Sequence, residues 1–323
     1  MIMKLNKKYE IGQKVATREA YGDALAEFGS DPRLVVMDAD LSKSTKTANF
    51  KKVYPDRFIN CGIAEGNMMS VAAGLATTGK IVFASSFAMF AAGRAFEQVR
   101  NSIGYPHLNV KIGATHAGIT VGEDGATHQC NEDLGVMRTI PGMVVINPAD
   151  AVEARAAVAA AIRYNGPMYL RFGRLAVPVV NDEETYEFEI GKGIQLRDGK
   201  DVTIVSTGIC PDQALKAAEE LAQEGISARV VNIHTIKPID VEILTKAARE
   251  TGCIVTAEEH NIIGGLGSAV CESVSATCPV PVLRVGVNDV FGKSGKATEL
   301  IDEFGLSARF IKAKAKEAIA LKK

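Results

Sequence analysis

Tryptophan is absent from this chain, and histidine and cysteine are scarce, with five and six copies among 323 residues. The cysteines are scattered and form no C-x-x-C pair, which argues against a zinc site or a disulfide framework and favours reduced thiols. Lysine and arginine number 37 against 38 acidic residues, so the formal charge is −1. This balance excludes a whole-molecule field that would attract nucleic acid or an anionic membrane.

Long hydrophobic runs are also missing. No apolar stretch approaches the roughly 20 residues that a membrane-spanning helix needs. Residues 1–10 are polar and basic and lack the apolar core of a signal peptide. We therefore predict a cytoplasmic protein with no membrane segment and no nucleic-acid partner.

Short β-branched runs alternate with alanine-rich helical stretches, which predicts an α/β protein with mostly parallel, doubly wound sheets. The length favours two domains, which we place at residues 1–180 and 190–323, with a linker over 175–185. The predicted strands are residues 34–37, 81–83, 110–114, 144–146 and 169–172 in the first domain and 203–206, 229–233, 254–256 and 282–285 in the second. The predicted helices cover 18–28, 65–77, 93–103 and 150–164, then begin at Pro211, Asp240 and Ser307.

Residues 114–129, Ala-Thr-His-Ala-Gly-Ile-Thr-Val-Gly-Glu-Asp-Gly-Ala-Thr-His-Gln, form the most informative stretch. They place His116, Asp124 and His128 on a glycine-rich loop after a predicted strand, where open α/β sheets gather their ligands. Imidazoles exchange protons near neutral pH, carboxylates accept hydrogen bonds from hydroxyls, and glycines let the backbone approach closely. The pattern predicts a site for a small polar substrate, against the alternative of a surface turn with incidental histidines.

Two further motifs together indicate a pocket for a planar ring. Glu65 lies at a strand-to-helix junction between Gly62 and Gly66, although a first-turn glutamate on its own more often serves the helix dipole. Phe87 and Phe90, three residues apart, can face one way, although such a pair alone is more often plain core. A carboxylate beside an aromatic wall is what a heterocyclic cofactor requires.

Candidate anion-binding residues follow strands or open helices. Arg18 begins the first predicted helix, Ser44 ends an Asp-Ala-Asp-Leu-Ser-Lys-Ser run, and Arg171 and Arg174 follow the last strand of the first domain. These positions suit phosphate, although a solvated Arg18 is the commoner outcome. We interpret His260 as structural or interfacial, and the Gly-Gly-Leu-Gly run after it lacks the spacing of a nucleotide-binding loop.

Taken in order, these motifs resemble the C-terminal half of a transketolase over nearly the whole chain. Residues 190–323 resemble that family's C-terminal domain, which is a weaker match. Within the first domain, the runs similar to the family's pyrimidine-domain motifs are Ala-Asp40-Leu-Ser, Gly-Ile-Ala-Glu65, Phe87-Ala-Met-Phe90 and the highly specific Gly-Glu-Asp124-Gly-Ala-Thr-His128-Gln.

The resemblance implies thiamine diphosphate as cofactor. Glu65 would hydrogen-bond N1′ of the aminopyrimidine, and a carboxylic acid donates such a bond only when protonated. Phe87 and Phe90 would pack against the ring. Asp40 would lie near the cofactor, as would Arg94, close to where single-chain relatives place a tyrosine.

The resemblance also implies a division of labour along the substrate. Asp124 and His128 would contact its hydroxyls and assist proton transfer during movement of a two-carbon ketol unit from a ketose phosphate to an aldose acceptor. A tightly bound remote phosphate positions the reacting carbonyl. The residues implied at that far end are Arg18, Ser44, His116 and Arg171.

Two departures from the family pattern shape the expected assembly. The chain has no Gly-Asp-Gly motif, with which transketolases bind the diphosphate and its Mg²⁺ or Ca²⁺ through an N-terminal domain. We therefore expect one subunit of a split transketolase, inactive without an N-terminal partner subunit and paired with it in two copies each. His116 is followed by Ala117 instead of an acidic residue, so donor recognition is expected to differ. The alternatives are a 1-deoxyxylulose-5-phosphate synthase-like enzyme, a 2-oxo-acid dehydrogenase β-subunit-like enzyme and a non-catalytic subunit.

Overall fold

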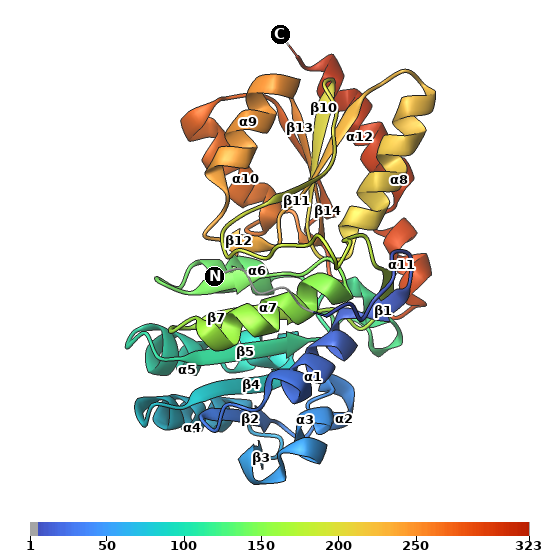
Figure 1. Ribbon diagram of the computed structural model, residues 1–323. Coiled ribbons are helices and arrows are strands. Elements are labelled where there is room, and N and C mark those ends of the chain that lie inside the picture. Colours follow the sequence, from blue (N-terminus) through green and yellow to red (C-terminus); the bar gives the residue numbers. More distant parts are fainter. Residues whose placement is uncertain (1–5, 323) are drawn as a thin grey trace.

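The computed structural model, which describes residues 6–322, contains two β-sheets with helices packed on their faces, and these two layered units lie one above the other (Figure 1). The larger sheet has the strand order β12-β6-β7-β5-β4-β2-β3, and its neighbours are parallel except for β12, which runs antiparallel to β6. Its strands are β2 (Leu34–Asp38), β3 (Phe58–Asn60), β4 (Ile81–Phe87), β5 (Val110–Thr115), β6 (Val144–Ile146), β7 (Met168–Phe172) and β12 (Thr235–Lys237).

Helices cover both faces of this sheet because its strands bury alternate residues on opposite sides. Phe83 packs in a cluster with Leu25 and Val158 of the helices on one face. Its neighbour Ala84 packs with Met68 on the other face. The first face carries α1 (Thr17–Phe28), α3 (Ala48–Val53) and α7 (Ala151–Arg163), and the second carries α4 (Glu65–Thr77) and α6 (Asp133–Arg138).

The helix predicted over residues 93–103 is wider and longer than expected. It starts at Met89–Arg94 as a π-helix, continues through α5 (Phe96–Gln98) and returns to π-helical geometry over Val99–Gly104. Such widened turns recur at functional sites, where they displace side chains relative to a regular helix. Here the widened segment carries Phe90 and Arg94.

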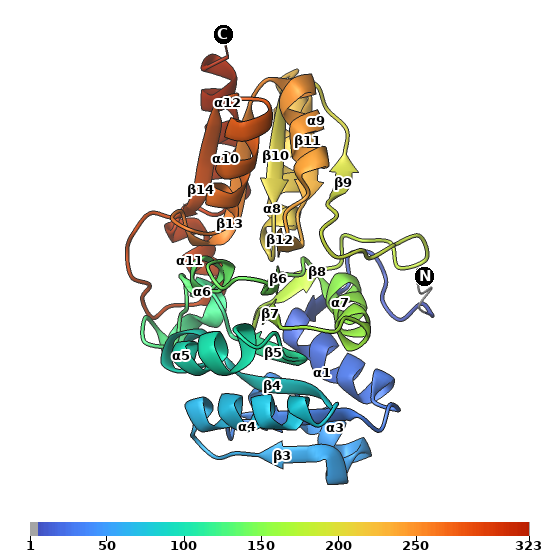
Figure 2. The ribbon, with the colours of Figure 1, turned by 90° about the vertical axis from the view of Figure 1, so that its left-hand side faces the viewer.

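The smaller sheet has the order β14-β13-β10-β11-β9, parallel except for β9. Its helices lie on two sides of the strands, at the left and the right in Figure 1, and Figure 2 looks onto one of these two helix layers. The α/β class with two mostly parallel sheets is thus confirmed. The strands are β9 (Ile194–Arg197), β10 (Val202–Ser206), β11 (Ala228–Asn232), β13 (Ile254–Asn261) and β14 (Val282–Val287), and the helices are α8 (Cys210–Gln223), α9 (Val241–Thr251), α10 (Leu266–Thr277), α11 (Ala297–Glu303) and α12 (Ala308–Ala320).

The predicted linker is wrong at its start. Residues Ala176–Pro178 form β8, which pairs antiparallel with β1 (Lys14–Ala16), because the buried Val177 gains a partner strand at the base of α1. Strand β12 also crosses from the second half of the sequence into the larger sheet. One apolar cluster joins Met137 of α6 to Ile233 and Leu266 of the second half. The boundary between residues 180 and 190 remains a prediction.

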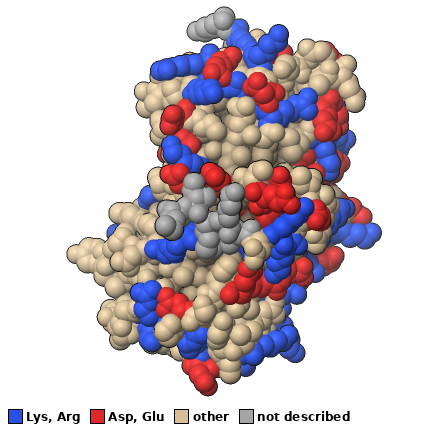
Figure 3. Space-filling model, in the orientation of Figure 1, with Lys and Arg blue, Asp and Glu red and all other residues tan. Residues whose placement is uncertain are grey.

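The surface carries charges of both signs. Figure 3 shows lysine and arginine intermixed with acidic residues over the visible face, without a field of one sign. Across residues 6–322, we find no helix with the length and apolarity needed to cross a bilayer.

Candidate active site

The predicted site residues gather at one edge of the larger sheet. Five adjacent strands, β7, β5, β4, β2 and β3, all end there because they run parallel. The segments that follow these strands carry Arg174 after β7, His116 after β5, Phe90 after β4, Asp40 after β2 and Glu65 after β3. The order of the strands thus brings together residues that are far apart in sequence.

Four rings pack together at the centre of this edge. Phe87 stacks on His116 with centroids 3.8 Å apart and on Phe90 at 6.0 Å. His128 meets Phe90 edge-on at 5.4 Å. Phe87 is buried beneath the histidine, whereas Phe90 and His128 are partly exposed. The aromatic wall and both histidines of the loop therefore form one contiguous surface.

His116 is held as a neutral base. Its side chain is buried, and burial together with the neighbouring charges of Arg18 and Arg174 lowers the pKa of His116 to about 3. Nε2 lies 3.2 Å from the Arg18 guanidinium, which can only donate, so this nitrogen accepts. Nδ1 then carries the proton and faces the Thr115 hydroxyl at 2.9 Å.

Arg18 connects the histidine to a short turn after β2. Its Nη1 donates to the Ser44 carbonyl at 2.8 Å, and burial lowers the pKa of Arg18. Ser44 therefore contacts Arg18 through its backbone carbonyl oxygen. The turn itself is built by Asp38, whose carboxylate accepts from the Leu41 amide and the Thr45 hydroxyl, both at 2.6 Å. Burial raises the pKa of Asp38, and these hydrogen bonds oppose the rise.

Glu65 is a buried acid capped by a surface arginine. Only 2% of its side chain is exposed, against 57% for Arg94, and Arg94 Nη1 donates to Glu65 Oε2 at 3.0 Å. The same guanidinium lies 4.9 Å from the centroid of Phe90. Arg94 thus bridges the carboxylate and the aromatic wall, and contacts run without a break from Glu65 to Arg18.

The two aspartates of the site lie at its rim. Asp40 has a left-handed backbone, with φ of 62°, and exchanges two hydrogen bonds with Asn60 at 3.0 and 3.1 Å. Asn60 was not singled out from the sequence, and its signal is its place at the end of a parallel strand. Asp124 ends the 3₁₀ turn Ile119–Asp124, which is kinked at Gly122. The Asp124 side chain is exposed.

Arg171 is buried within β7, and its role at the anion site remains a prediction. Its side chain is 3% exposed, and its Nε and Nη2 donate to the Asp133 carboxylate at 2.8 and 3.1 Å, so these two nitrogens are occupied inside the protein. Arg171 lies within β7, whereas Arg174 lies two residues beyond the strand end. Arg174 is 37% exposed, contacts Glu123 at 2.9 Å, and its charge helps lower the pKa of both Arg18 and His116.

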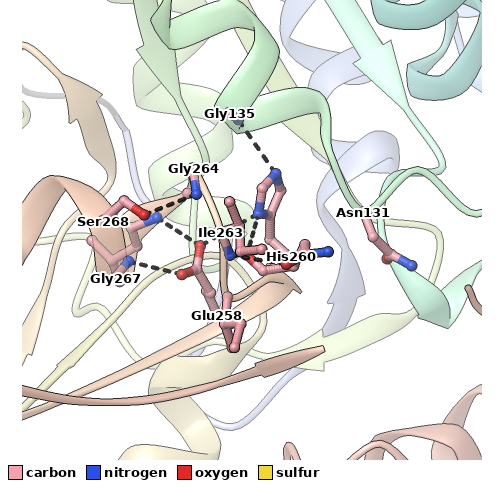
Figure 4. Close-up of polar contacts among 12 residues, drawn as sticks. Asn131, Gly135, Glu258, His260, Ile263, Gly264, Gly267 and Ser268 are labelled. Carbon is pink, nitrogen blue, oxygen red and sulfur yellow. Dashed lines mark hydrogen bonds and ion pairs between the residues drawn. The ribbon is translucent and has the colours of Figure 1, made fainter. Parts of the chain in front are cut away.

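His260 lies at the junction between the two halves of the chain (Figure 4). Its Nε2 accepts from the Gly135 amide of α6 at 3.3 Å, and its Nδ1 lies 2.7 Å from the Asn261 carbonyl. Beside it, the Glu258 carboxylate accepts from the first amides of α10, those of Leu266 and Gly267, at 2.6 and 2.8 Å. The protein's own carboxylate therefore fills the N-terminus of α10, which begins at Leu266 within the Gly-Gly-Leu-Gly run.

The surface from Glu65 past Phe90 and His128 to Arg18, which we call the groove, carries the groups that an aminopyrimidine needs. A buried carboxylate, a half-buried phenyl ring and an imidazole supply the acid, the stacking face and the polar edge that such a ring needs. At Gly62, beside the acid, a Cβ would meet no atom within 4 Å, so the turn leaves open space. Among residues 6–322 there is no cluster of three His, Cys, Asp or Glu side chains that could hold a metal ion.

The chain belongs to the transketolase family. Residues 13–179 match the transketolase pyrimidine binding domain, and residues 191–311 match the transketolase C-terminal domain. Within that family it corresponds to the C-terminal section of a split transketolase. It is 54% identical to a putative transketolase C-terminal section of Methanocaldococcus jannaschii, over 91% of this chain and 93% of the relative.

Two further comparisons agree with this assignment. The chain is 47% identical to the 6-deoxy-6-sulfo-D-fructose transketolase subunit SqwH of Clostridium sp. (strain MSTE9), over 93% of each chain. A solved structure described as a split gene transketolase, inactive β4 tetramer, superposes with a TM-score of 0.89 at 55% identity, over 96% of this chain and 100% of that chain.

Proposed function

We propose that this chain is the C-terminal subunit of a two-subunit transketolase that moves a two-carbon ketol unit from a ketose phosphate to an aldose acceptor. The observation that carries the proposal is the unbroken line of contacts from Glu65 through Arg94, Phe90 and Phe87 to His116 and Arg18. It places a buried acid at one end of the groove and a cation at the other, with both histidines between them. The enzyme works in the cytoplasm.

Thiamine diphosphate is the proposed cofactor, and it supplies a nucleophilic thiazolium carbon that also stabilises negative charge on the substrate. Glu65 would hold the aminopyrimidine at N1′, with Phe90 and Phe87 as its stacking wall and Asp40 at the rim. Burial of the Glu65 side chain excludes water from this contact and strengthens it. A separate N-terminal subunit would bind the diphosphate and its Mg²⁺ or Ca²⁺.

His128 and Asp124 are the proposed proton-handling and hydroxyl-binding residues. Both border the groove, and His128 has its Nδ1 3.0 Å from the Thr127 hydroxyl, which leaves Nε2 for substrate. His116, kept neutral, accepts from Arg18 and has no proton to give at Nε2. The proton-transfer role therefore belongs to His128, while His116 orients Arg18 and the Phe87 ring.

The far end of the groove is proposed to bind an anionic tail. Arg18 and Arg174 supply two guanidinium groups there, and Ser44 lies in the adjoining turn. A relative at 47% identity is named for a sugar with a 6-sulfo group. Phosphate and sulfonate present similar oxygens to a guanidinium, so this end accepts the shared anion chemistry.

Reconstitution tests the proposal. The chain and its N-terminal partner subunit are mixed with thiamine diphosphate, Mg²⁺, an aldose acceptor and a phosphorylated or sulfonated ketose, and transfer of the ketol unit is followed by mass spectrometry. Transfer is expected only with both subunits present, in a complex with two copies of each. Calorimetry on the isolated chain is expected to show little thiamine diphosphate binding. Tight binding without the partner, or decarboxylation of pyruvate in place of ketol transfer, would contradict the proposal.

A further inference from the structure

A carboxylate of the second half of the chain reaches the back of the histidine loop. Glu259 lies on β13 of the smaller sheet, and its side chain is buried with 2% of its surface exposed. Its Oε1 accepts from the backbone amide of Thr120 at 2.6 Å. Thr120 is the second residue of the turn that ends at Asp124, so the contact fixes the turn from behind.

The loop has a glycine where this carboxylate lies. Gly118 adopts a left-handed φ of +76°, which other residues reach only with strain. A Cβ at Gly118 would lie 2.2 Å from Cδ of Glu259, so the acid occupies the space of the missing side chain. The amide of Gly118 donates to the Cys130 carbonyl at 2.8 Å and closes the base of the loop. The acid and the glycine are thus mutually fitted.

Glu259 is itself held in place by Arg171. Arg171 Nη2 donates to the Glu259 carbonyl at 3.0 Å, and its Nε and Nη2 donate to the Asp133 carboxylate. Burial raises the pKa of Glu259, and the Arg171 charge and the hydrogen bond from Thr120 oppose that rise. A rigid chain of contacts therefore runs from Asp133 of α6 through Arg171 and Glu259 to Thr120.

We propose that Glu259 is a positioning residue that presents the histidine loop to the substrate, so that the second domain acts on catalysis without touching the groove. Its hydrogen bond to Thr120 fixes the turn on which Asp124 lies. The kinetic consequences rest on the proposed transketolase function, whereas the structural consequence does not. Misplacement of reacting groups by about 1 Å costs as much as 100-fold in rate.

Hydrogen exchange on the intact chain tests the structural step. Glu259→Ala leaves the Thr120 amide without its acceptor, so exchange across residues 117–122 is expected to accelerate at least tenfold. Glu259→Gln keeps an acceptor oxygen at the same distance and is expected to exchange as the wild type does. Val255→Ala, on the same strand but packed against α8 and α12, is the control for general destabilisation. Unchanged loop exchange in a folded Glu259→Ala chain would overturn the proposal.

Kinetics of the reconstituted complex test the functional step. Glu259→Ala is expected to lower kcat/KM for the ketose donor by about 10- to 100-fold, with thiamine diphosphate affinity unchanged and Glu259→Gln restoring activity. An equal loss in Val255→Ala would reduce Glu259 to a structural role and overturn the proposal. If Glu259→Ala does not fold, Gly118→Ala displaces the same carboxyl from the loop side and is expected to give the same losses. A wild-type complex without ketol transfer would refute the proposed function, while loop exchange would still decide the role of Glu259.

Discussion

The carboxyl edges of the two sheets are built alike and used differently. At the larger sheet, Glu65 follows its strand with a surface cation as partner, and His128 and Asp124 border a groove. At the smaller sheet, the polar side chains near the strand ends make their hydrogen bonds to other parts of the protein. Glu258 caps α10 and Glu259 binds Thr120 of the histidine loop.

The contrast shows how a doubly wound sheet can serve as a support. Asn232, at the end of β11, donates to the buried Glu153 of α7 at 2.8 Å and so also reaches into the first domain. His260 also contacts the first domain, where its Nε2 accepts a hydrogen bond from the Gly135 amide. Buried polar groups need partners, and here the partners lie across the junction. The second domain thereby fixes the orientation of the first.

The largest effect is expected from Glu65, the buried acid that Arg94 links to the aromatic wall. Glu65→Gln keeps the shape of the side chain and abolishes acid–base exchange at N1′, so kcat of the reconstituted complex should fall by about 10²- to 10⁴-fold. Glu97→Gln, an exposed glutamate in α5, should leave kcat unchanged. Unaltered turnover in the Glu65→Gln complex would remove the acid from the mechanism and revive a non-catalytic role for this chain.

The next effect falls on stability. Arg171→Met leaves Asp133 buried and unpaired, and breaking a buried pair from one side typically costs about 3–5 kcal/mol. Urea denaturation should show this as a lower midpoint at unchanged slope. The double variant Arg171→Met with Asp133→Leu should recover part of the loss, since no uncompensated charge remains. A single variant as stable as the wild type would show that the pair is solvated.

His116 is expected to make the free energy of unfolding fall at acid pH. The pKa of His116 is about 3 in the folded chain and 6.5 ordinarily, so between these values the unfolded chain binds a proton that the folded chain does not. The resulting stability is complete above about pH 6.5 and is lost as the pH falls towards 3, about 2 kcal/mol of it by pH 5. His116→Gln should flatten that loss. His234→Gln, at a buried histidine with a pKa also near 3, should flatten it equally without changing KM for the donor.

A smaller effect separates Arg174, which lies beyond β7, from Arg171, which lies within it. Arg174→Met should raise KM for a phosphorylated or sulfonated donor about tenfold, because a charge-assisted hydrogen bond is lost. Cofactor affinity and unfolding free energy should stay near wild type, in contrast to Arg171→Met. An equal KM change for an uncharged donor would show that Arg174 acts on loop shape through its contact with Val121 and not on the anion.

Much of the fold follows from local pattern. The buried strands β2, β4, β5 and β7 are short apolar runs between helical periods, and each lies where the sequence predicts it. The short edge strands β1, β8 and β12 carry no such signal, because three residues gain stability only from a partner far away in sequence. The π-helical turns Met89–Arg94 and Val99–Gly104 carry no such signal either, and both pack against α4.

The residues of the site also fall into those that the sequence could predict and those that it could not. His116, His128, Glu65 and Phe90 could be identified because polar or aromatic residues followed strands, and the parallel sheet then brought them to one edge. Arg171 and Arg174 are only three residues apart, so the sequence does not tell which of them lies within the strand and which lies beyond it. Glu259 left no local trace, since its partner lies 139 residues earlier in the chain. Side chains that act across the domain junction become visible only when the junction is seen.

The smallest effect concerns the cap on the acid. Arg94 is half exposed, and an exposed ion pair is worth about 0.2–1 kcal/mol, so its removal should change binding by no more than about fivefold. Removal of Arg94 is expected to favour the cofactor, because the guanidinium donates to the Glu65 carboxylate and lies over the Phe90 face, where the aminopyrimidine would bind. Arg94→Met should therefore tighten thiamine diphosphate binding to the reconstituted complex, measured by calorimetry. Weaker binding in that variant would make Arg94 part of the cofactor wall, and the exposed Arg100→Met serves as the control for lost surface charge.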